Sequence, residues 1–300
     1  MEFGKVSTAA LEITDFALPP EPKLNQAILT GVKAPITKLF VGASQWGVKE
    51  WVGKIYPKGT PATRFLDEYV KNFNSIELNA THYKIYPPET IQKWAERAAD
   101  KHFRFCPKLF QEITHKGALK DHDNLLYAFL QSAEAFGEHL GSIFMQLPEW
   151  FGPERQTELY DFLEALPPGT DFFIEVRHKD WFLEPQQTEL FRTLQDLNVG
   201  AVITDVAGRR DCCHMQLTVK KALIRFVANS LHPTDYTRID AWAERIRYWL
   251  DNGLQEVYFM LHVQDETFTP ELSIYATERL NEVCRLNLPV PVWKAPPELF

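Results

Sequence analysis

Eight short apolar segments alternate with stretches of helical periodicity, and this alternation constrains the fold more than any other feature of the chain. The segments have the composition of strands and occupy residues 38–44, 75–79, 102–108, 141–147, 171–176, 199–205, 222–227 and 256–262. Apolar residues at helical spacing follow every segment except the sixth, after which residues 206–220 are too irregular to predict a helix. Such alternation predicts a parallel sheet with helical crossovers.

The number of units selects among parallel-sheet folds. Eight units in about 265 residues match the usual size of a TIM barrel. An open doubly wound sheet would usually carry a glycine-rich phosphate turn after its first strand, and no GxGxxG motif is present. The sequence therefore predicts an α/β protein with a single (β/α)8 barrel over residues 37–300. Residues 1–36 are predicted to form an N-terminal extension, in which several prolines interrupt regular structure.

Composition narrows the classes of partner. The formal net charge of −8 argues against a broad footprint on nucleic acid or anionic lipid. No run of about 18 apolar residues is present, so no membrane span is expected. The four cysteines form no CxxC pair, and the first residues do not have the pattern of a signal peptide. These features predict a cytoplasmic protein with reduced thiols.

Polar and charged side chains stand at the ends of these apolar segments, where a TIM barrel carries its active site. Charged groups inside apolar runs are costly unless they pair with one another or bind a ligand. The candidate catalytic residues are Glu77, Lys108, Glu175 and Asp205. The candidate substrate-binding residues are Ser44, Trp46, Asn79, Tyr83, His115, Gln146, Arg177, Trp181, Arg225 and His262, with Trp181 as a lid or stacking surface.

An ordered set of short motifs carries a resemblance to a known family. The motifs are Gly42-Ala-Ser44 with Trp46 and Trp51, Tyr56-Pro57, Glu77-Leu-Asn79 with Thr81 and Tyr83, Lys108 with Ile113-Thr-His115, Gln146-Leu-Pro148, Glu175-Val-Arg177 with Trp181, and Thr204-Asp205. In these positions the chain resembles the domain-of-unknown-function-72 family, also called YecE-like. The resemblance implies a TIM barrel with a polar pocket, and it implies no particular reaction.

The chain departs from the common pattern of that family at three places. His82 stands where the family commonly has Phe, Val227-Ala228 where it has His-Gly, and His262-Val263 where it has Asn-Asn. A changed substrate and a weakened activity are both consistent with these departures.

The charged candidates support more than one chemistry. Glu77 and Glu175 could divide acid and base roles, as the paired carboxylates of glycosidases do, or could simply neutralise Lys108 or Arg177. Lys108, Arg177 and Arg225 together favour an anionic ligand, because arginine binds phosphate or carboxylate through two parallel hydrogen bonds. A buried Lys108 with a lowered pKa could instead form a Schiff base.

The leading hypothesis is an enzyme, a hydrolase or a lyase, that acts on a small anionic or phosphate-bearing substrate. The alternatives are a non-catalytic module that binds an anion or nucleotide, and a metal-dependent, nuclease-like barrel. A divalent metal would use imidazole and carboxylate ligands from His115, Asp205, Glu77 and His262. No HxH or HExxH motif supports that site, so a metal cofactor is not favoured.

Replacing Arg177 with Lys separates a ligand-binding role from a structural one. The change keeps the charge and loses the two-pronged geometry. We expect the affinity for an anionic ligand to fall by about 1–3 kcal/mol, the scale of a charged hydrogen bond, while the melting temperature stays unchanged. A lowered melting temperature with unaltered affinity would identify Arg177 as a structural residue instead.

Overall fold

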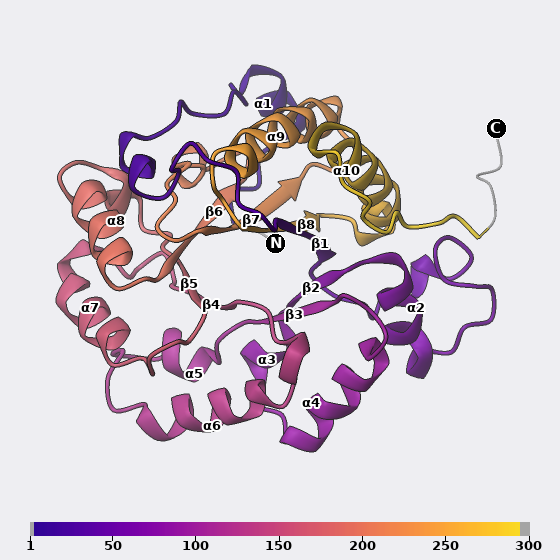
Figure 1. Cartoon of the computed structure of the whole chain (residues 1–300), viewed down its shortest axis with the longest axis horizontal. Helices are drawn as coiled ribbons and strands as arrows, with labels where there is room; N and C mark the ends of the chain where they lie inside the picture. The colour runs from indigo at the N-terminus through magenta and orange to yellow at the C-terminus, as the bar shows by residue number, and fades with distance from the viewer. Residues whose placement is uncertain (1–2, 295–300) are drawn as a thin grey trace.

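Eight parallel strands form a barrel, and helices surround it in a ring (Figure 1). The computed structural model describes residues 3–294. The strands are β1 Lys38–Ala43, β2 Ser75–Leu78, β3 Arg104–Pro107, β4 Ile143–Gln146, β5 Phe172–Glu175, β6 Gly200–Asp205, β7 Lys221–Ala228 and β8 Glu256–Val263. Each strand falls on one of the eight apolar segments, which confirms the predicted TIM-like barrel.

The barrel is nearly closed. The strands pair in the order β3-β2-β1-β8-β7-β6-β5-β4, so β3 and β4 are the last neighbours. Isolated bridges join Phe105 to Leu140 and Lys108 to Phe144 across this seam. Two backbone hydrogen bonds, from Gly141 to Phe105 and from Leu109 to Phe144, measure 2.7 and 2.8 Å. The seam therefore fixes Lys108 beside β4.

Helices follow the strands as the periodicity predicts. They are α1 Thr8–Ile13, α2 Phe65–Asn72, α3 Ala80–Tyr83, α4 Pro88–Ala95, α5 Gln111–Thr114, α6 Asp123–Glu134, α7 Gln156–Glu164, α8 Gln186–Asp196, α9 Pro233–Asp251 and α10 Thr269–Cys284. Between β6 and β7 the chain makes only a short 3-10 turn, Arg210–Cys212. The short helix α1 is not predicted from the sequence, because the prolines that suggest an irregular extension all lie beyond it. The helices α3 and α5 are not predicted either, because each is a single turn of four residues in the segment after a strand. Among residues 3–294, no helix combines the length and the apolar character that crossing a bilayer requires.

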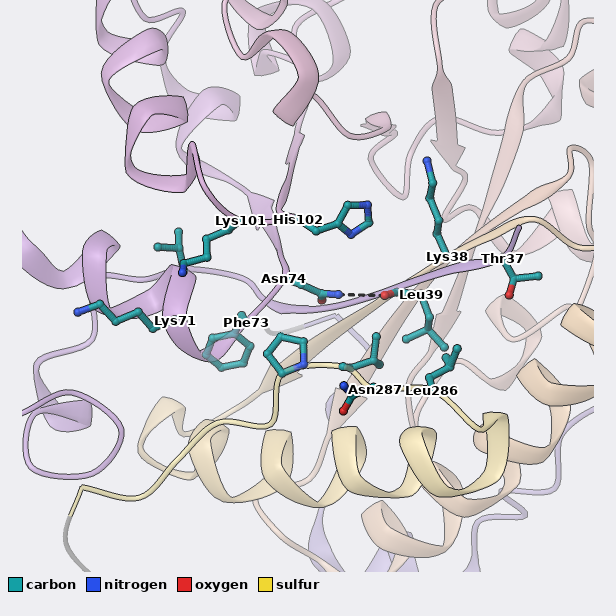
Figure 2. Close-up of a pocket in the computed structure, with 13 residues that line it drawn as sticks. Thr37, Lys38, Leu39, Lys71, Phe73, Asn74, Lys101, His102, Leu286 and Asn287 are labelled. Atoms are coloured by element: carbon teal, nitrogen blue, oxygen red, sulfur yellow. Dashed lines mark hydrogen bonds between the residues drawn. The ribbon is translucent and has the colours of Figure 1, made fainter. Parts of the chain in front are cut away.

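At the amino ends of the strands lies a cavity of about 530 Å³, shown in Figure 2. Leu39, Phe73 and Leu286 form part of its apolar wall, and Lys71 and Lys101 stand at its margin. Asn74 crosses the gap between β1 and β2 and donates a 3.0 Å hydrogen bond to the carbonyl of Leu39. None of the site residues predicted from the sequence lines this cavity.

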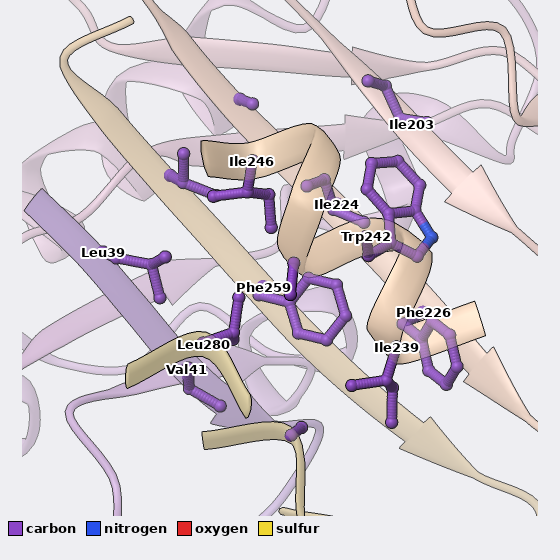
Figure 3. Packing of buried hydrophobic residues seen from close by; sticks show 14 of the residues in the cluster. Leu39, Val41, Ile203, Ile224, Phe226, Ile239, Trp242, Ile246, Phe259 and Leu280 are labelled. Atoms are coloured by element: carbon purple, nitrogen blue, oxygen red, sulfur yellow. The ribbon is translucent and has the colours of Figure 1, made fainter. Parts of the chain in front are cut away.

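Alternate residues of each strand face opposite sides, which gives the barrel an inner and an outer core. Outward residues of β1, β6, β7 and β8 pack against α9 and α10, with Trp242 between Ile203 and Phe226 (Figure 3). The inner core is an apolar layer made of Phe40, Cys106, Phe144, Phe173, Val202, Val219, Leu223, Tyr258 and Met260. Residues two positions further along several of these strands form the next inner layer, which includes the polar side chains of Lys108, Gln146, Glu175, Thr204 and Arg225.

The N-terminal strap, residues 3–29, covers the side of the barrel where no helix joins β6 to β7. Buried Asn25 donates a 2.9 Å hydrogen bond to the carbonyl of Met215 and accepts one of 2.7 Å from the amide of Leu217. The strap also bonds to α8 through Gln195 and to α9 through Trp249. In Figure 1 the strap runs along the outside between α8 and α9, and its first described residues lie over the barrel. The strap thus occupies the place that a crossover helix would take.

Replacing Asn25 with Ala tests this anchor. The change leaves two buried backbone groups, at Met215 and Leu217, without their partner, so we expect the free energy of unfolding to fall by about 1–3 kcal/mol. Denaturant unfolding measures the loss, and the exposed neighbour Gln26→Ala serves as a control that should change it little. Equal stabilities of the two variants would mean that the strap is not docked through Asn25.

Candidate functional site

A single guanidinium holds two carboxylates together inside the carboxyl end of the barrel. Arg225 on β7 donates two 2.8 Å hydrogen bonds to Glu77 on β2 and one of 2.5 Å to Glu175 on β5. Arg225, Glu77 and Glu175 are at most 2% exposed. The three side chains come from strands far apart in the sequence and meet because each occupies an inward position one layer above the apolar inner core.

Further polar groups complete the carboxylates, and we call the whole set the Arg225 network. Glu175 accepts hydrogen bonds from Thr204 at 2.9 Å and from Arg177 Nε at 3.0 Å. Glu77 accepts a 3.0 Å bond from Asn79, and His262 Nε2 lies 2.8 Å from its other oxygen. These contacts satisfy both carboxylates in a region closed to water, which is the condition for burying charge.

The electrostatics of the network keep both carboxylates ionised. Burial alone would raise the pKa of Glu77, but the charges of Arg225 and His262 together lower it well below its usual range. Burial would likewise raise the pKa of Glu175, but the charges of Arg177 and Arg225 outweigh this effect and lower the pKa to about 2. The pKa of Arg225 is raised, because the attraction of the two carboxylates exceeds the cost of its burial. Neither glutamate therefore has the raised pKa that a general acid needs near neutral pH.

Lys108 is a buried amine of this layer whose pKa is lowered, which favours its neutral form. It follows β3 at the seam, is 7% exposed, and donates a 2.9 Å hydrogen bond to Gln146 of β4. Burial and the charge of Arg225 lower the pKa of Lys108 to about 8, although Glu77 and Glu175 act in the opposite direction. Among residues 3–294, Gln146 is its one side-chain hydrogen-bond partner, so two of the three ammonium hydrogens have no protein acceptor.

Two histidines flank Lys108 on the side of β2 and β3. The rings of His82 and His115 lie 5.0 Å apart, and the exposed ring of Tyr83 lies against His82. Burial and the charge of Lys108 lower the pKa of both histidines to about 4. His82, which departs from the common family pattern, bonds to the carbonyl of Leu109 at 2.7 Å and so helps position the segment that carries Lys108.

Two of the predicted binding residues lie at the edge of the Arg225 network or outside it. Ser44 follows β1 and donates a 3.1 Å bond to Glu266, while its carbonyl accepts a bond from Asn79. Trp46 turns outward and meets Trp94 edge-on at 5.2 Å, in a groove between α2 and α4. Ser44 therefore adjoins the Arg225 network, whereas Trp46 does not.

Asp205, predicted as a catalytic residue, faces away from the barrel interior. Its carboxylate accepts hydrogen bonds from Arg238 and Trp242 of α9 and pairs with Arg210. Burial would raise the pKa of Asp205, but Arg238 and Arg210 lower it. Figure 3 shows Trp242 on this outer side, beside Ile203. Asp205 fastens α9 to β6, and the inward residue of this pair is Thr204, which the sequence analysis did not select as a site residue.

Trp181 is fully buried and cannot be a lid. It lies in the 3-10 turn Lys179–Phe182, packs with the outer core around β4 and β5, and donates a 2.9 Å hydrogen bond to the carbonyl of Phe151. Its indole ties the loop after β5 to the loop after β4. It thereby supports the position of Arg177 from outside the barrel.

The residues considered for a metal do not come together. Glu77 and His262 are in contact, but Asp205 faces the opposite side of its strand. Within residues 3–294, no three histidine, cysteine, aspartate or glutamate side chains form a group that could hold a metal ion.

Replacing Arg225 with Met tests whether the network depends on this one cation. The variant leaves two buried carboxylates without their main partner, so we expect a loss of about 3–5 kcal/mol in the free energy of unfolding at pH 7. The exposed Arg64→Met serves as control and should change stability little. A loss below about 1 kcal/mol in the Arg225 variant would contradict this assignment.

The same variant should reverse the dependence of stability on pH. In the wild type the pKa of Glu175 is lowered to about 2, from about 4.3 when unfolded, so its stabilisation is complete above about pH 5 and is lost as the pH falls. Without Arg225 the buried carboxylates should bind protons more readily in the folded state, so the variant should gain stability between pH 7 and pH 5. Parallel denaturant titrations at both pH values measure the two slopes.

Comparison with known proteins identifies the family of the chain. The family model described as "Protein of unknown function DUF72" matches residues 40–294. The UPF0759 protein YecE of Escherichia coli K12 is 30% identical over 253 residues, covering 78% of this chain and 89% of that protein. The UPF0759 protein YunF of Bacillus subtilis is 25% identical over 154 residues, covering 49% and 53% of the two chains.

Solved structures show the same fold. A DUF72 family protein from Enterococcus faecalis V583 superposes with a TM-score of 0.62 at 17% identity, covering 87% of this chain and 100% of the other. A DUF72 family protein from Thermotoga maritima MSB8 gives 0.61 at 19% identity, with 83% and 100% covered. The extent of the family match and of the similarity to YecE shows that this chain belongs to the DUF72 family.

Proposed function

We propose that this protein is an enzyme of the lyase type that acts on a small anionic carbonyl compound, and that Lys108 is its catalytic residue. One observation carries the proposal: Lys108 is buried at the carboxyl end of the barrel, and burial with the nearby Arg225 lowers its pKa to about 8. At pH 7.5 about a quarter of such an amine is neutral, about two hundred times more than of an ordinary lysine. A neutral amine can attack a carbonyl carbon.

The reaction would begin with the attack of Nζ on the substrate carbonyl. The carbonyl oxygen takes one proton from the amine and one from solvent and leaves as water, while the nitrogen keeps its second hydrogen, so the product is a protonated imine. The imine draws electrons from the neighbouring carbon, so that a bond there can break while the nitrogen accepts the electron pair. Gln146, bonded to Nζ at 2.9 Å, would orient the amine.

Charge in the layer supports an anionic substrate. Arg177 and Lys108 bring positive charge to the mouth, while both carboxylates are held deep by Arg225. The lowered pKa values of Glu77 and Glu175 favour a lyase over a hydrolase of the glycosidase kind, because neither carboxyl can deliver a proton near pH 7. The carboxylates would instead fix the electrostatic surroundings of the amine.

A non-catalytic anion-binding module is the second candidate. The observation that favours it is that Arg225, Glu77 and Glu175 satisfy one another, so that these three residues supply no acid or base for a reaction. In such a module Lys108 would bind an anion as a point charge and form no covalent bond.

Trapping with borohydride distinguishes the lyase from the non-catalytic anion-binding module. The wild type is incubated with a panel of 2-oxo acids and aldehyde phosphates and then reduced, and mass spectrometry locates any adduct. We expect an adduct on Lys108 that forms faster as the pH rises toward 8, that is absent from Lys108→Arg, and that persists in Lys116→Arg, a change at an exposed lysine.

Two other outcomes would reject the lyase, the anion-binding module or both. Failure of every carbonyl compound to form an adduct on Lys108 would reject the lyase. Phosphate and carboxylate titrations that show equal affinity for the wild type and Lys108→Met would also reject the anion-binding module.

A further inference from the structure

The N-terminal strap places an aromatic ring directly above the Arg225 network. Phe3 is 9% exposed and packs with Val206, Cys212 and Val227, with Phe182 at the edge of the cluster. Val227 lies on β7 two residues after Arg225, and Val206 comes directly after β6, two residues after Thr204, so both continue the inward-facing positions. The ring of Phe3 therefore lies in the mouth of the barrel, in the layer where a substrate above the network would lie.

Two guanidinium groups face this ring. The Cζ atom of Arg177 lies 4.1 Å from the ring centroid of Phe3, and that of Arg209 lies 5.2 Å away. These distances fit cation–π contacts, which attract any aromatic ring in this place, not phenylalanine alone. The surroundings of this ring, which we call the Phe3 site, thus combine two apolar valine side chains with two guanidinium groups that face the ring.

The backbone of the strap is fitted closely to the mouth. The amide of Gly208 donates a 2.8 Å hydrogen bond to the carbonyl of Gly4. Gly4 has a φ of +66°, and a Cβ atom there would lie 2.7 Å from Val206, so only glycine fits. The strap is held further back by Asn25, and this tether keeps the ring of Phe3 near its site at an effective concentration of about millimolar.

We infer that the Phe3 site is an aromatic subsite of the barrel mouth, with Phe3 as its internal occupant, and that the ligand it accepts carries an aromatic ring beside an anionic group. The aromatic part of this inference stands on the contacts of Phe3. The anionic part rests on the proposed function, since it places the charged group of the ligand toward Lys108. A ligand of this kind has to displace Phe3 before its own ring can bind.

Replacing Phe3 with Ala should empty the subsite. Isothermal titration with phenyl phosphate should give an affinity at least tenfold higher for Phe3→Ala than for the wild type, because the competing ring is gone. Methyl phosphate, which has no ring, should bind both proteins within twofold. Ile13→Ala, at an exposed position of the same strap, should behave as the wild type does with both probes.

Methyl resonances of Val206 and Val227 check the fold and the place of binding in the same samples. The ring of Phe3 should shift these resonances in the wild type, the shift should vanish in Phe3→Ala, and phenyl phosphate or neutral benzyl alcohol should restore it. Dispersed methyl spectra of the variant would show that it is folded.

The outcomes separate this inference from the proposed function. Equal affinity of the two proteins for phenyl phosphate, with no response at Val206 and Val227, would overturn the subsite. Restoration of the shifts by benzyl alcohol, with no higher affinity for phenyl phosphate than for benzyl alcohol, would support the aromatic subsite and reject an anion-binding site beside it. Binding of methyl phosphate without any preference for the phenyl compound would overturn the subsite and support the anion site.

Discussion

The hydrogen bonds from Arg225 to Glu77 and Glu175 are the contact on which the carboxyl half of the barrel depends. They join β2, β5 and β7 across the interior, above the apolar inner layer that includes Phe40, Phe144 and Phe173. A buried pair of carboxylates would repel and lose hydration, and one guanidinium between them removes both costs at once. Burial lowers the pKa of Lys108, and the charge of Arg225 lowers it further. Burial also lowers the pKa values of His82 and His115, and for both histidines the next cause is the charge of Lys108.

The barrel is also shaped by the helix that is missing after β6. A TIM barrel normally covers each strand pair with a crossover helix, and here a short 3-10 turn stands in that place. The N-terminal strap closes the gap, and in doing so it reaches from the outer wall to the mouth. Because the N-terminal strap takes the place of this helix, Phe3 lies over the site. At Val227, where the family pattern commonly has a polar residue, an apolar side chain forms the floor beneath that ring.

The sequence predicts the fold well because the alternation of strands and helices is regular, and it predicts Glu77, Glu175 and Arg225 as site residues because charges in apolar strands stand out. It fails at Asp205 for a physical reason. A strand covered on both faces is apolar on both, so hydrophobicity does not reveal which of Thr204 and Asp205 faces inward. Nor does local sequence show that Arg225, rather than Lys108 or Arg177, bridges the two glutamates. The contact of Phe3 could not be predicted at all, because it depends on docking between segments about 200 residues apart.

The anchoring of the strap through Asn25 has a consequence for biosynthesis. Its partners, Met215 and Leu217, lie 190 and 192 residues further along the chain. During synthesis the strap is therefore made before these partners, so its anchor through Asn25 can form only after the sixth strand and the turn after it have emerged from the ribosome. Contacts of such long separation carry a large loop-closure cost and form late. We accordingly expect the strap to dock at Met215 and Leu217 late in folding, after six of the eight strands have been made.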